Sequence, residues 1–186
     1  MTHLVTATSL IKAYGLTNVV FFPQHPIHGS ADGPQPTSLL SSVGLPHSAI
    51  FTSKTDLEHM YEFGFNPTTL AGLLGHLGRP FPYETRAWWP LGYLFTSLIA
   101  VDPESGRVYS FPESEEHYIL LHRDVESLLF ALIELRKLEV DHDNNVAPEE
   151  LSERFRRVVG AFDPTPFADE ESQWNLSLEE LEHGIW

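Results

Sequence analysis

The sequence predicts a single domain in which helices are combined with a β-sheet, and three observations support this. The length of 186 residues suits one compact domain, and the apolar share of 42% is that of an ordinary globular protein. Twelve Phe, six Tyr and four Trp supply enough large side chains for one core. Residues 88–135 read as a strand, a turn, a second strand and a helix.

The N-terminal part is expected to hold a helix, a strand and a short helical turn. Apolar side chains recur at helical spacing over Leu4–Tyr14, and Gly15 is well placed to end that helix. Thr17–Phe22 reads as a strand, whereas residues 24–36 are rich in Pro, Gly and His and read as a loop. A helical turn is expected over Thr37–Val43.

The next part of the chain is harder to interpret. Pro46 favours extended geometry in the residue before it, and a strand is expected over Ala49–Thr52. Residues 55–82 give no clear prediction, because leucines at helical spacing alternate with glycines that each weaken a helix by about 1 kcal/mol. These residues are Leu70, Leu73, Leu74 and Leu77, with Gly72, Gly75 and Gly78.

A hairpin followed by a long helix is the clearest prediction. Strands are expected at Leu98–Val101 and Arg107–Phe111, joined by Asp102–Gly106, which carries Pro and Gly at turn positions. The helix that follows has a wide apolar stripe from Val125 onward. Lys137 lies near its C-terminal end, where the helix dipole favours cations.

The C-terminal segment, residues 148–186, is expected to be helical and acidic. Asp141–Asn145 reads as a polar connector before it. Pro148–Gly160 fits a helix, because Pro suits the first position, two Glu residues suit the first turn and Gly suits the stop. A short final helix is expected over Leu176–Ile185, with its apolar side facing the domain and its acidic side facing solvent.

The charge of the chain is strongly negative. There are 26 acidic and 11 basic residues, a net charge of −15, and residues 139–186 hold 13 acidic residues against three Arg. Such a field repels phosphate and anionic lipid, so nucleic acid and membrane are disfavoured as partners and a basic protein is favoured. The alternative, which composition alone favours, is a solvated acidic face that only maintains solubility.

The usual motifs of enzymatic chemistry are absent from the sequence. It has no Cys, no Walker loop, no Rossmann glycine fingerprint and no Gly-x-Ser-x-Gly elbow. His25 and His28 lack the second pair of a tetrahedral metal site, and Asp141–Asn145 lacks the Gly and Glu of a calcium loop. We therefore expect no catalytic residue, metal or cofactor. The absence of a signal-peptide pattern and of a membrane-spanning run indicates a cytoplasmic protein.

A series of short motifs occurs in a characteristic order. They are the helix ending at Gly15, Val19-Val20-Phe21-Phe22-Pro23, Gly44-Leu45-Pro46, Leu91-Gly92-Tyr93, Ile99-Ala100-Val101-Asp102, Gly106-Arg107-Val108-Tyr109, Ser127-Leu128-Leu129-Phe130, and a closing Phe162-Asp163-Pro164 with Trp174. In this order they resemble the SUKH superfamily, in particular its SUKH-4-like branch of actinobacterial-type immunity proteins. The resemblance extends over essentially the whole chain.

The resemblance implies both a fold and a function. The fold is α+β, with a twisted, mainly antiparallel sheet flanked by helices. The function is that of an immunity protein in a bacterial polymorphic toxin system. Such a protein binds and neutralises a cognate toxin domain, often a nuclease or a nucleic-acid deaminase, and has no catalysis or cofactor of its own.

Charge and resemblance together suggest where the toxin binds. Nuclease domains present basic clefts, so an acidic inhibitor gains association rate and specificity. We expect acidic turns near the sheet edge and in the C-terminal segment to contact the toxin, with a Trp as aromatic anchor. The residues are Trp88, Trp89, Glu113, Glu115, Glu116, Glu170 and Glu171. Two other classes remain open, a SUKH-like scaffold that binds a host protein and a small hydrolase with dispersed His and carboxylate residues.

Overall fold

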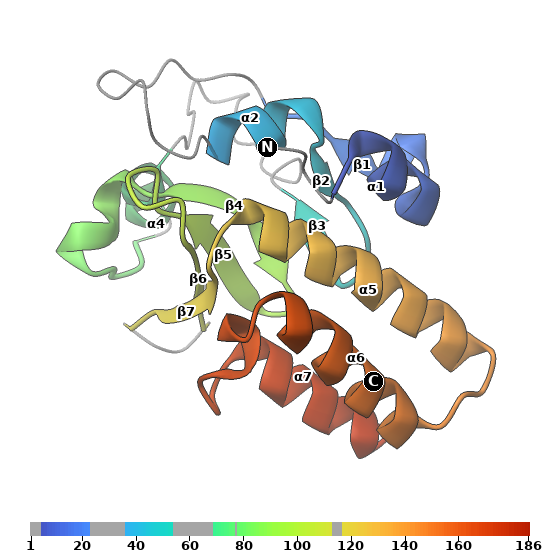
Figure 1. Cartoon of the computed structure of the whole chain (residues 1–186). Coiled ribbons are helices and arrows are strands. Elements are labelled where there is room, and N and C mark those ends of the chain that lie inside the picture. Colours follow the sequence, from blue (N-terminus) through green and yellow to red (C-terminus); the bar gives the residue numbers. More distant parts are fainter. Residues whose placement is uncertain (1–4, 23–35, 54–68, 77, 113–116) are drawn as a thin grey trace.

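An antiparallel sheet lies at the centre of the computed structural model, which describes residues 5–22, 36–53, 69–76, 78–112 and 117–186 (Figure 1). Its strands follow one another in sequence order, and each neighbouring pair is antiparallel. They are β3 (Phe51–Ser53), β4 (Trp89–Leu94), β5 (Ser97–Val101), β6 (Val108–Phe111) and β7 (Ile119–His122). The expected α+β fold with a mainly antiparallel sheet is thus confirmed.

The predicted hairpin is formed by β5 and β6, in which Leu98 pairs with Phe111 and Val101 with Val108. The strands β4 and β7 are additional to this prediction. β4 contains Pro90 and Gly92, both poor strand formers, and its register shifts between them as in a β-bulge. Gly92 is required here, because a Cβ on it would lie 2.3 Å from the backbone oxygen of Thr52 on β3.

Helices cover both faces of the sheet. Alternate residues of β5 point to opposite faces. Ile99 and Val101 belong to the larger core cluster, which is built with α5 (Val125–Asp143), whereas Leu98 and Ala100 belong to a smaller cluster. The smaller cluster is covered by α4 (Leu70–His76) and by Trp88, which follows η3 (Tyr83–Ala87).

The N-terminal elements pack against α5. The helix α1 (Ala7–Tyr14) begins with a capping box between Thr6 and Ser9, and Gly15, at φ 85°, ends it as predicted. The Tyr14 hydroxyl donates to the backbone oxygen of Leu132 on α5, at 2.6 Å. This contact fixes α1 against the helix that covers the sheet.

A small two-stranded sheet connects α1 with α2 (Pro36–Ser42). Only β1 (Val19–Val20) of the strand expected over residues 17–22 is extended, because a 3-10 turn, η1 (Leu16–Asn18), occupies its first part. β1 pairs with β2 (Leu45–Pro46), which was not predicted as a strand.

Three helices complete the fold, and two of their predicted ends are wrong. α5 continues to Asp143, six residues beyond Lys137, so most of the expected polar connector is its last turn. α6 (Pro148–Phe162) passes through Gly160, because the ring of Phe162 packs on Phe130 at 4.6 Å between centroids. It is followed by η4 (Thr165–Phe167) and by α7 (Gln173–Glu182), the expected final helix.

Some predictions concern residues outside the described ranges. Of the loop expected over residues 24–36, only Pro36 is described, as the first residue of α2, and of the unassigned residues 55–82 those at 55–68 and 77 are not described. Leu70, Leu73 and Leu74 form the buried side of α4. None of the helices in the described ranges combines the length and apolarity needed to cross a membrane.

Candidate functional site

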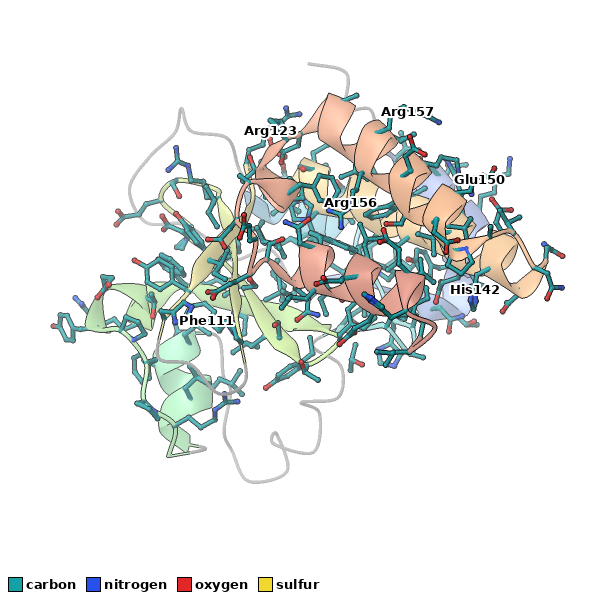
Figure 2. All side chains as sticks on the ribbon, turned by 90° about the horizontal axis from the view of Figure 1, so that it is seen from below. Phe111, Arg123, His142, Glu150, Arg156 and Arg157 are labelled. Atoms are coloured by element: carbon teal, nitrogen blue, oxygen red, sulfur yellow. The ribbon has the colours of Figure 1, made fainter. Side chains whose placement is uncertain are left out.

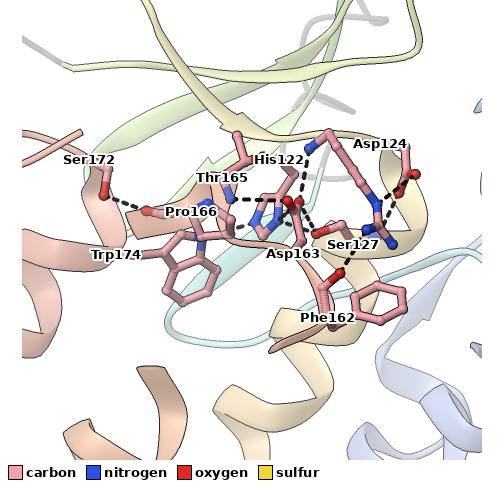
Figure 3. A network of polar contacts seen from close by, with 10 residues as sticks. His122, Asp124, Ser127, Phe162, Asp163, Thr165, Pro166, Ser172 and Trp174 are labelled. Carbon is pink, nitrogen blue, oxygen red and sulfur yellow. Dashed lines mark hydrogen bonds and ion pairs between the residues drawn. The ribbon is translucent and has the colours of Figure 1, made fainter. Parts of the chain in front are cut away.

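His122, at the end of β7, lies at the centre of a buried hydrogen-bond network (Figure 3). The exposed fractions of His122 and Ser127 are 0%, and that of Asp163 is 1%. Trp174 Nε1 donates to His122 Nε2 at 2.9 Å, so the proton of the neutral ring is on Nδ1. Nδ1 lies 2.8 Å from Ser127 Oγ and donates to it, and that hydroxyl donates to Asp163 Oδ2 at 2.5 Å.

The carboxylate of Asp163 is held by backbone groups as well. It accepts hydrogen bonds from the N–H of Arg123 and from the N–H of Thr165, each at 3.0 Å. Burial alone would raise the pKa of Asp163, but the hydrogen bonds from Ser127, Thr165 and Arg123 outweigh it and hold the pKa below its usual value. Asp163 is therefore ionised at neutral pH.

The histidine of the network is neutral. Burial lowers the pKa of His122 to about 3, although the negative charge of Asp163 acts in the opposite direction. The 3.9 Å separation between His122 Nδ1 and Asp163 Oδ2 is therefore not an ion pair at neutral pH.

The residue types of this network are those of a serine hydrolase, but the arrangement is different. In a catalytic triad the His lies between an accessible Ser and the Asp, so that the imidazole can take the proton of the nucleophile. Here the Ser lies between the other two residues, the second nitrogen of His122 is occupied by Trp174, and no member is accessible. The network is a structural link between β7, α5, the α6–η4 connection and α7.

Nine exposed carboxylates lie on α6, on α7 and on the turn between η4 and α7. We call this set the acidic surface, and its members are Glu149, Glu150, Glu153, Asp169, Glu170, Glu171, Glu179, Glu180 and Glu182. Within the described part of the chain, none of these nine side chains forms an ion pair. Glu182 does accept a hydrogen bond from the Ser152 hydroxyl, and Asp169 accepts one from the N–H of Glu171.

Three carboxylates of α5 differ, because each forms an ion pair with a cation. Lys137 Nζ lies 2.5 Å from Glu134 Oε1, and Arg136 Nη1 lies 3.1 Å from Glu139 Oε2. Asp141 forms an ion pair with Arg154 of α6. One of the three arginines of residues 148–186 is thus paired with a carboxylate of α5 and not with the acidic surface.

The other two arginines of the C-terminal segment also leave the acidic surface without counterions. Arg156 lies between α6 and α7 and donates to the side-chain oxygen of Asn175 (Figure 2). Arg157 lies on the outer side of α6 and is exposed (Figure 2). The negative charge of the acidic surface is therefore not neutralised by ion pairs with the arginines of this segment.

An aromatic cluster surrounds Trp88 on the face of the sheet that α4 covers. Trp88 is only 8% exposed and stacks on Tyr109, with 4.3 Å between ring centroids. Tyr118 and Phe111 pack against its edges at 5.0 and 6.0 Å. Trp88 therefore serves mainly as the support of this cluster.

No three His, Asp or Glu side chains in the described ranges come together in a way that could hold a metal ion.

A family model described as SUKH-4 immunity protein matches residues 5–180. The chain belongs to the SUKH-4 immunity protein family. This membership confirms the resemblance inferred from the order of the motifs, and it supports an immunity role. The SUKH-4 chain has no match among the curated proteins or among the solved structures.

The predicted partner-binding residues of the SUKH-4 chain are in different environments. Glu170 and Glu171 are exposed on the turn between η4 and α7, within the acidic surface. Trp88 is buried, and Trp89 is half-buried against the larger core cluster, so the two indoles do not form one exposed anchor. Glu113, Glu115 and Glu116 lie outside the described residues. The binding role of all these residues stays a prediction.

The buried network of the SUKH-4 chain was not predicted. His122 reads as an isolated histidine after the apolar residues of β7, and its partner Trp174 is 52 residues away. In the sequence, Asp163 and Trp174 stand out only as parts of the closing motif. No local pattern shows that these side chains meet, because the packing of α6 and α7 brings them together.

Proposed function

We propose that this SUKH-4 protein neutralises a cognate toxin domain by binding it through the acidic surface of α6 and α7. The observation that carries the proposal is the lack of any counterion for its nine exposed carboxylates among the described residues. The toxin that fits best is a nuclease or a nucleic-acid deaminase, since an enzyme that binds phosphate backbones has a basic cleft.

The physical basis is a complementary electrostatic potential. Clustered like charges repel each other in the free protein, and a basic partner relieves that repulsion. The same field steers the two proteins together and raises the association rate at low salt. Binding over a basic cleft excludes nucleic acid from it, so the immunity protein needs no chemical step of its own.

The place of action follows from the same proposal. An immunity protein of this kind protects the cell that makes the toxin, so we place the complex in the cytoplasm of that cell. The stability of the complex sets the level of protection. Each tenfold decrease in its dissociation constant needs about 1.4 kcal/mol of binding free energy.

Growth rescue is the decisive experiment. The toxin domain encoded beside this chain is expressed from an inducible promoter, with and without the full-length chain. We expect growth to stop with the toxin alone and to resume when both are present, with a complex that co-purifies. Continued growth arrest, with the chain present in soluble form, contradicts the proposal and favours a scaffold role.

The location of the interface is tested by charge reversal. Glu171→Lys changes the acidic surface, whereas the control Glu104→Lys makes the same change of net charge on the exposed turn between β5 and β6. At low salt we expect Glu171→Lys to slow association with the toxin by about 2- to 5-fold, as expected for loss of one steering charge. Equal slowing by Glu104→Lys would show that net charge, and not this surface, guides association.

A further inference from the structure

Three tyrosines lie at the surface of the face that α4 covers. Tyr83 of η3 is 73% exposed, and Tyr109 of β6 and Tyr118 are partly exposed. The Tyr118 hydroxyl donates to the carboxylate of Glu84, at 3.4 Å, so η3 and the start of β7 meet here. We call Tyr83, Glu84, Tyr109 and Tyr118 the tyrosine surface.

Two of the three rings, those of Tyr109 and Tyr118, are held in place before any partner arrives. Tyr109 stacks on Trp88, and Tyr118 packs edge-on against Trp88 at 5.0 Å and against Tyr109 at 5.4 Å. Phe111 also packs against Tyr118, with 5.7 Å between the ring centroids. Figure 2 shows Phe111 between the sheet and α4. Fixed aromatic rings lose little conformational entropy on binding, which is why tyrosines are frequent at the centres of interfaces.

The chemistry of the tyrosine surface favours a guanidinium group. The guanidinium carbon of Arg86 lies 4.0 Å from the centroid of the Tyr83 ring, so this ring already stacks with one guanidinium of the same chain. Glu84 supplies a carboxylate next to the rings. A flat guanidinium can stack on a tyrosine while its N–H groups bind a carboxylate, which a lysine ammonium does less well.

The tyrosine surface is connected to the acidic surface through β7 and η4. Tyr118 immediately precedes β7, one of the two edge strands of the described five-stranded sheet, and β7 packs against η4. Glu170 and Glu171 follow η4 in the sequence. A partner bound at the edge formed by β7 and η4 can therefore contact carboxylates on one side and tyrosine rings on the other.

We infer that the tyrosine surface docks an arginine-bearing segment of the partner that the acidic surface attracts. The inference rests on the proposed function and extends it. It replaces Trp88, as aromatic anchor, by the tyrosines that Trp88 supports. The acidic surface provides long-range attraction, whereas the tyrosine surface provides short-range selection of arginine.

The test uses a probe that does not depend on knowing the toxin. The full chain is titrated with the peptide acetyl-Gly-Arg-Gly-Arg-Gly-amide and with its lysine twin, at physiological salt, and the aromatic ring signals are followed by NMR. Both peptides carry the same charge, so their difference reports the stacking and the hydrogen-bond geometry of the guanidinium group. We expect the arginine peptide to shift the ring signals of Tyr83, Tyr109 and Tyr118 more than the lysine peptide does.

Two variants make the outcome specific. Tyr83→Ala should weaken binding of the arginine peptide about 2- to 5-fold, the effect of one exposed cation–π contact. Leu16→Ala, which removes another large exposed side chain, 66% accessible on η1, should leave binding unchanged. Equal shifts with both peptides, or full affinity in Tyr83→Ala, would overturn the inference.

Growth rescue separates this inference from the proposed function. If the chain rescues growth and Tyr83→Ala binds the arginine peptide normally, the tyrosine surface is refuted while the immunity role stands. If rescue fails but the arginine peptide binds as expected, the toxin is the wrong partner and the preference of this surface for arginine stands.

Discussion

Replacing Ser127 by Ala tests the buried network, because this hydroxyl joins its two halves. It accepts from His122 Nδ1 and donates to Asp163 Oδ2, and it has no exposed surface. Removing it leaves the Nδ1–H of His122 without an acceptor, at a cost of about 1 to 3 kcal/mol. Asp163 also loses one charge-assisted hydrogen bond but keeps those from Arg123 and Thr165. We expect a total loss of about 2 to 4 kcal/mol in the free energy of unfolding.

The structure offers a matched control at Ser110. Its side chain is 1% exposed, and its hydroxyl has no hydrogen-bond partner among the described residues. Ser110→Ala makes the same chemical change as Ser127→Ala at a site of the same burial. This substitution removes a hydroxyl that is shielded from solvent and has no hydrogen-bond partner among the described residues. It should therefore leave the free energy of unfolding unchanged or raise it by up to about 1 kcal/mol.

Urea unfolding at pH 7, followed by tryptophan fluorescence, measures both variants. Thermal unfolding should show the same order, with Ser127→Ala about 5 to 15 °C below the parent, since 1 kcal/mol corresponds to roughly 2 to 4 °C in a chain of this size. If both variants lose the same stability, the loss comes from cavity formation, and the hydrogen-bond reasoning is refuted.

Three further predictions concern the fold. The pKa of His122 is about 3 in the folded protein and 6.5 in its unperturbed state. Between these pH values His122 is therefore protonated in the unfolded chain but not in the folded protein. The contribution of His122 to the free energy of unfolding is complete above about pH 6.5 and decreases between pH 6.5 and pH 3 by about 1.4 kcal/mol per pH unit. In urea unfolding, the free energy of unfolding of His122→Gln should decrease less between pH 7 and pH 5 than that of the parent. An equal decrease in both proteins would show that His122 does not cause this pH dependence. Gly92→Ala should disrupt the pairing of β3 with β4, because its Cβ would meet a backbone oxygen at 2.3 Å, whereas Gly75→Ala in α4 meets nothing and should add up to about 1 kcal/mol; circular dichroism and thermal unfolding compare the two. Tyr14→Phe should cost about 1 kcal/mol in urea unfolding through loss of its hydrogen bond to α5, and no change would show that this contact is not formed.

The predictable parts of the fold are those specified by local pattern. The hairpin of β5 and β6 follows from an apolar strand, a turn with Pro and Gly, and a second strand, and Gly15 ends α1 because its backbone takes a positive φ. The strand β4 is the opposite case. Pro90 and Gly92 argue against a strand locally, and the sheet tolerates them through a bulge and the close approach of β3.

The candidate site could be predicted only in part, because charge is a property of composition and burial is a property of packing. The acid of residues 148–186 is visible in the sequence, and Glu170 and Glu171 are exposed as a polar turn should be. The burial of Trp88 depends on Tyr109 and Phe111, which follow it by more than 20 residues. Likewise, nothing near His122 in the sequence identifies its partners on α5 and α7.

The division between the buried network and the acidic surface has a consequence for how this molecule can change. Asp163 and Trp174 fix α6 and α7 to the sheet from the inside, while the nine outer carboxylates form no ion pair with the described residues. Substitutions among those carboxylates therefore remove few folding contacts, and surface changes of this kind usually alter stability by less than about 0.5 kcal/mol. The exposed carboxylates of such a scaffold can therefore be replaced one at a time to give a new recognition surface, while the buried contacts that hold α6 and α7 on the sheet stay the same.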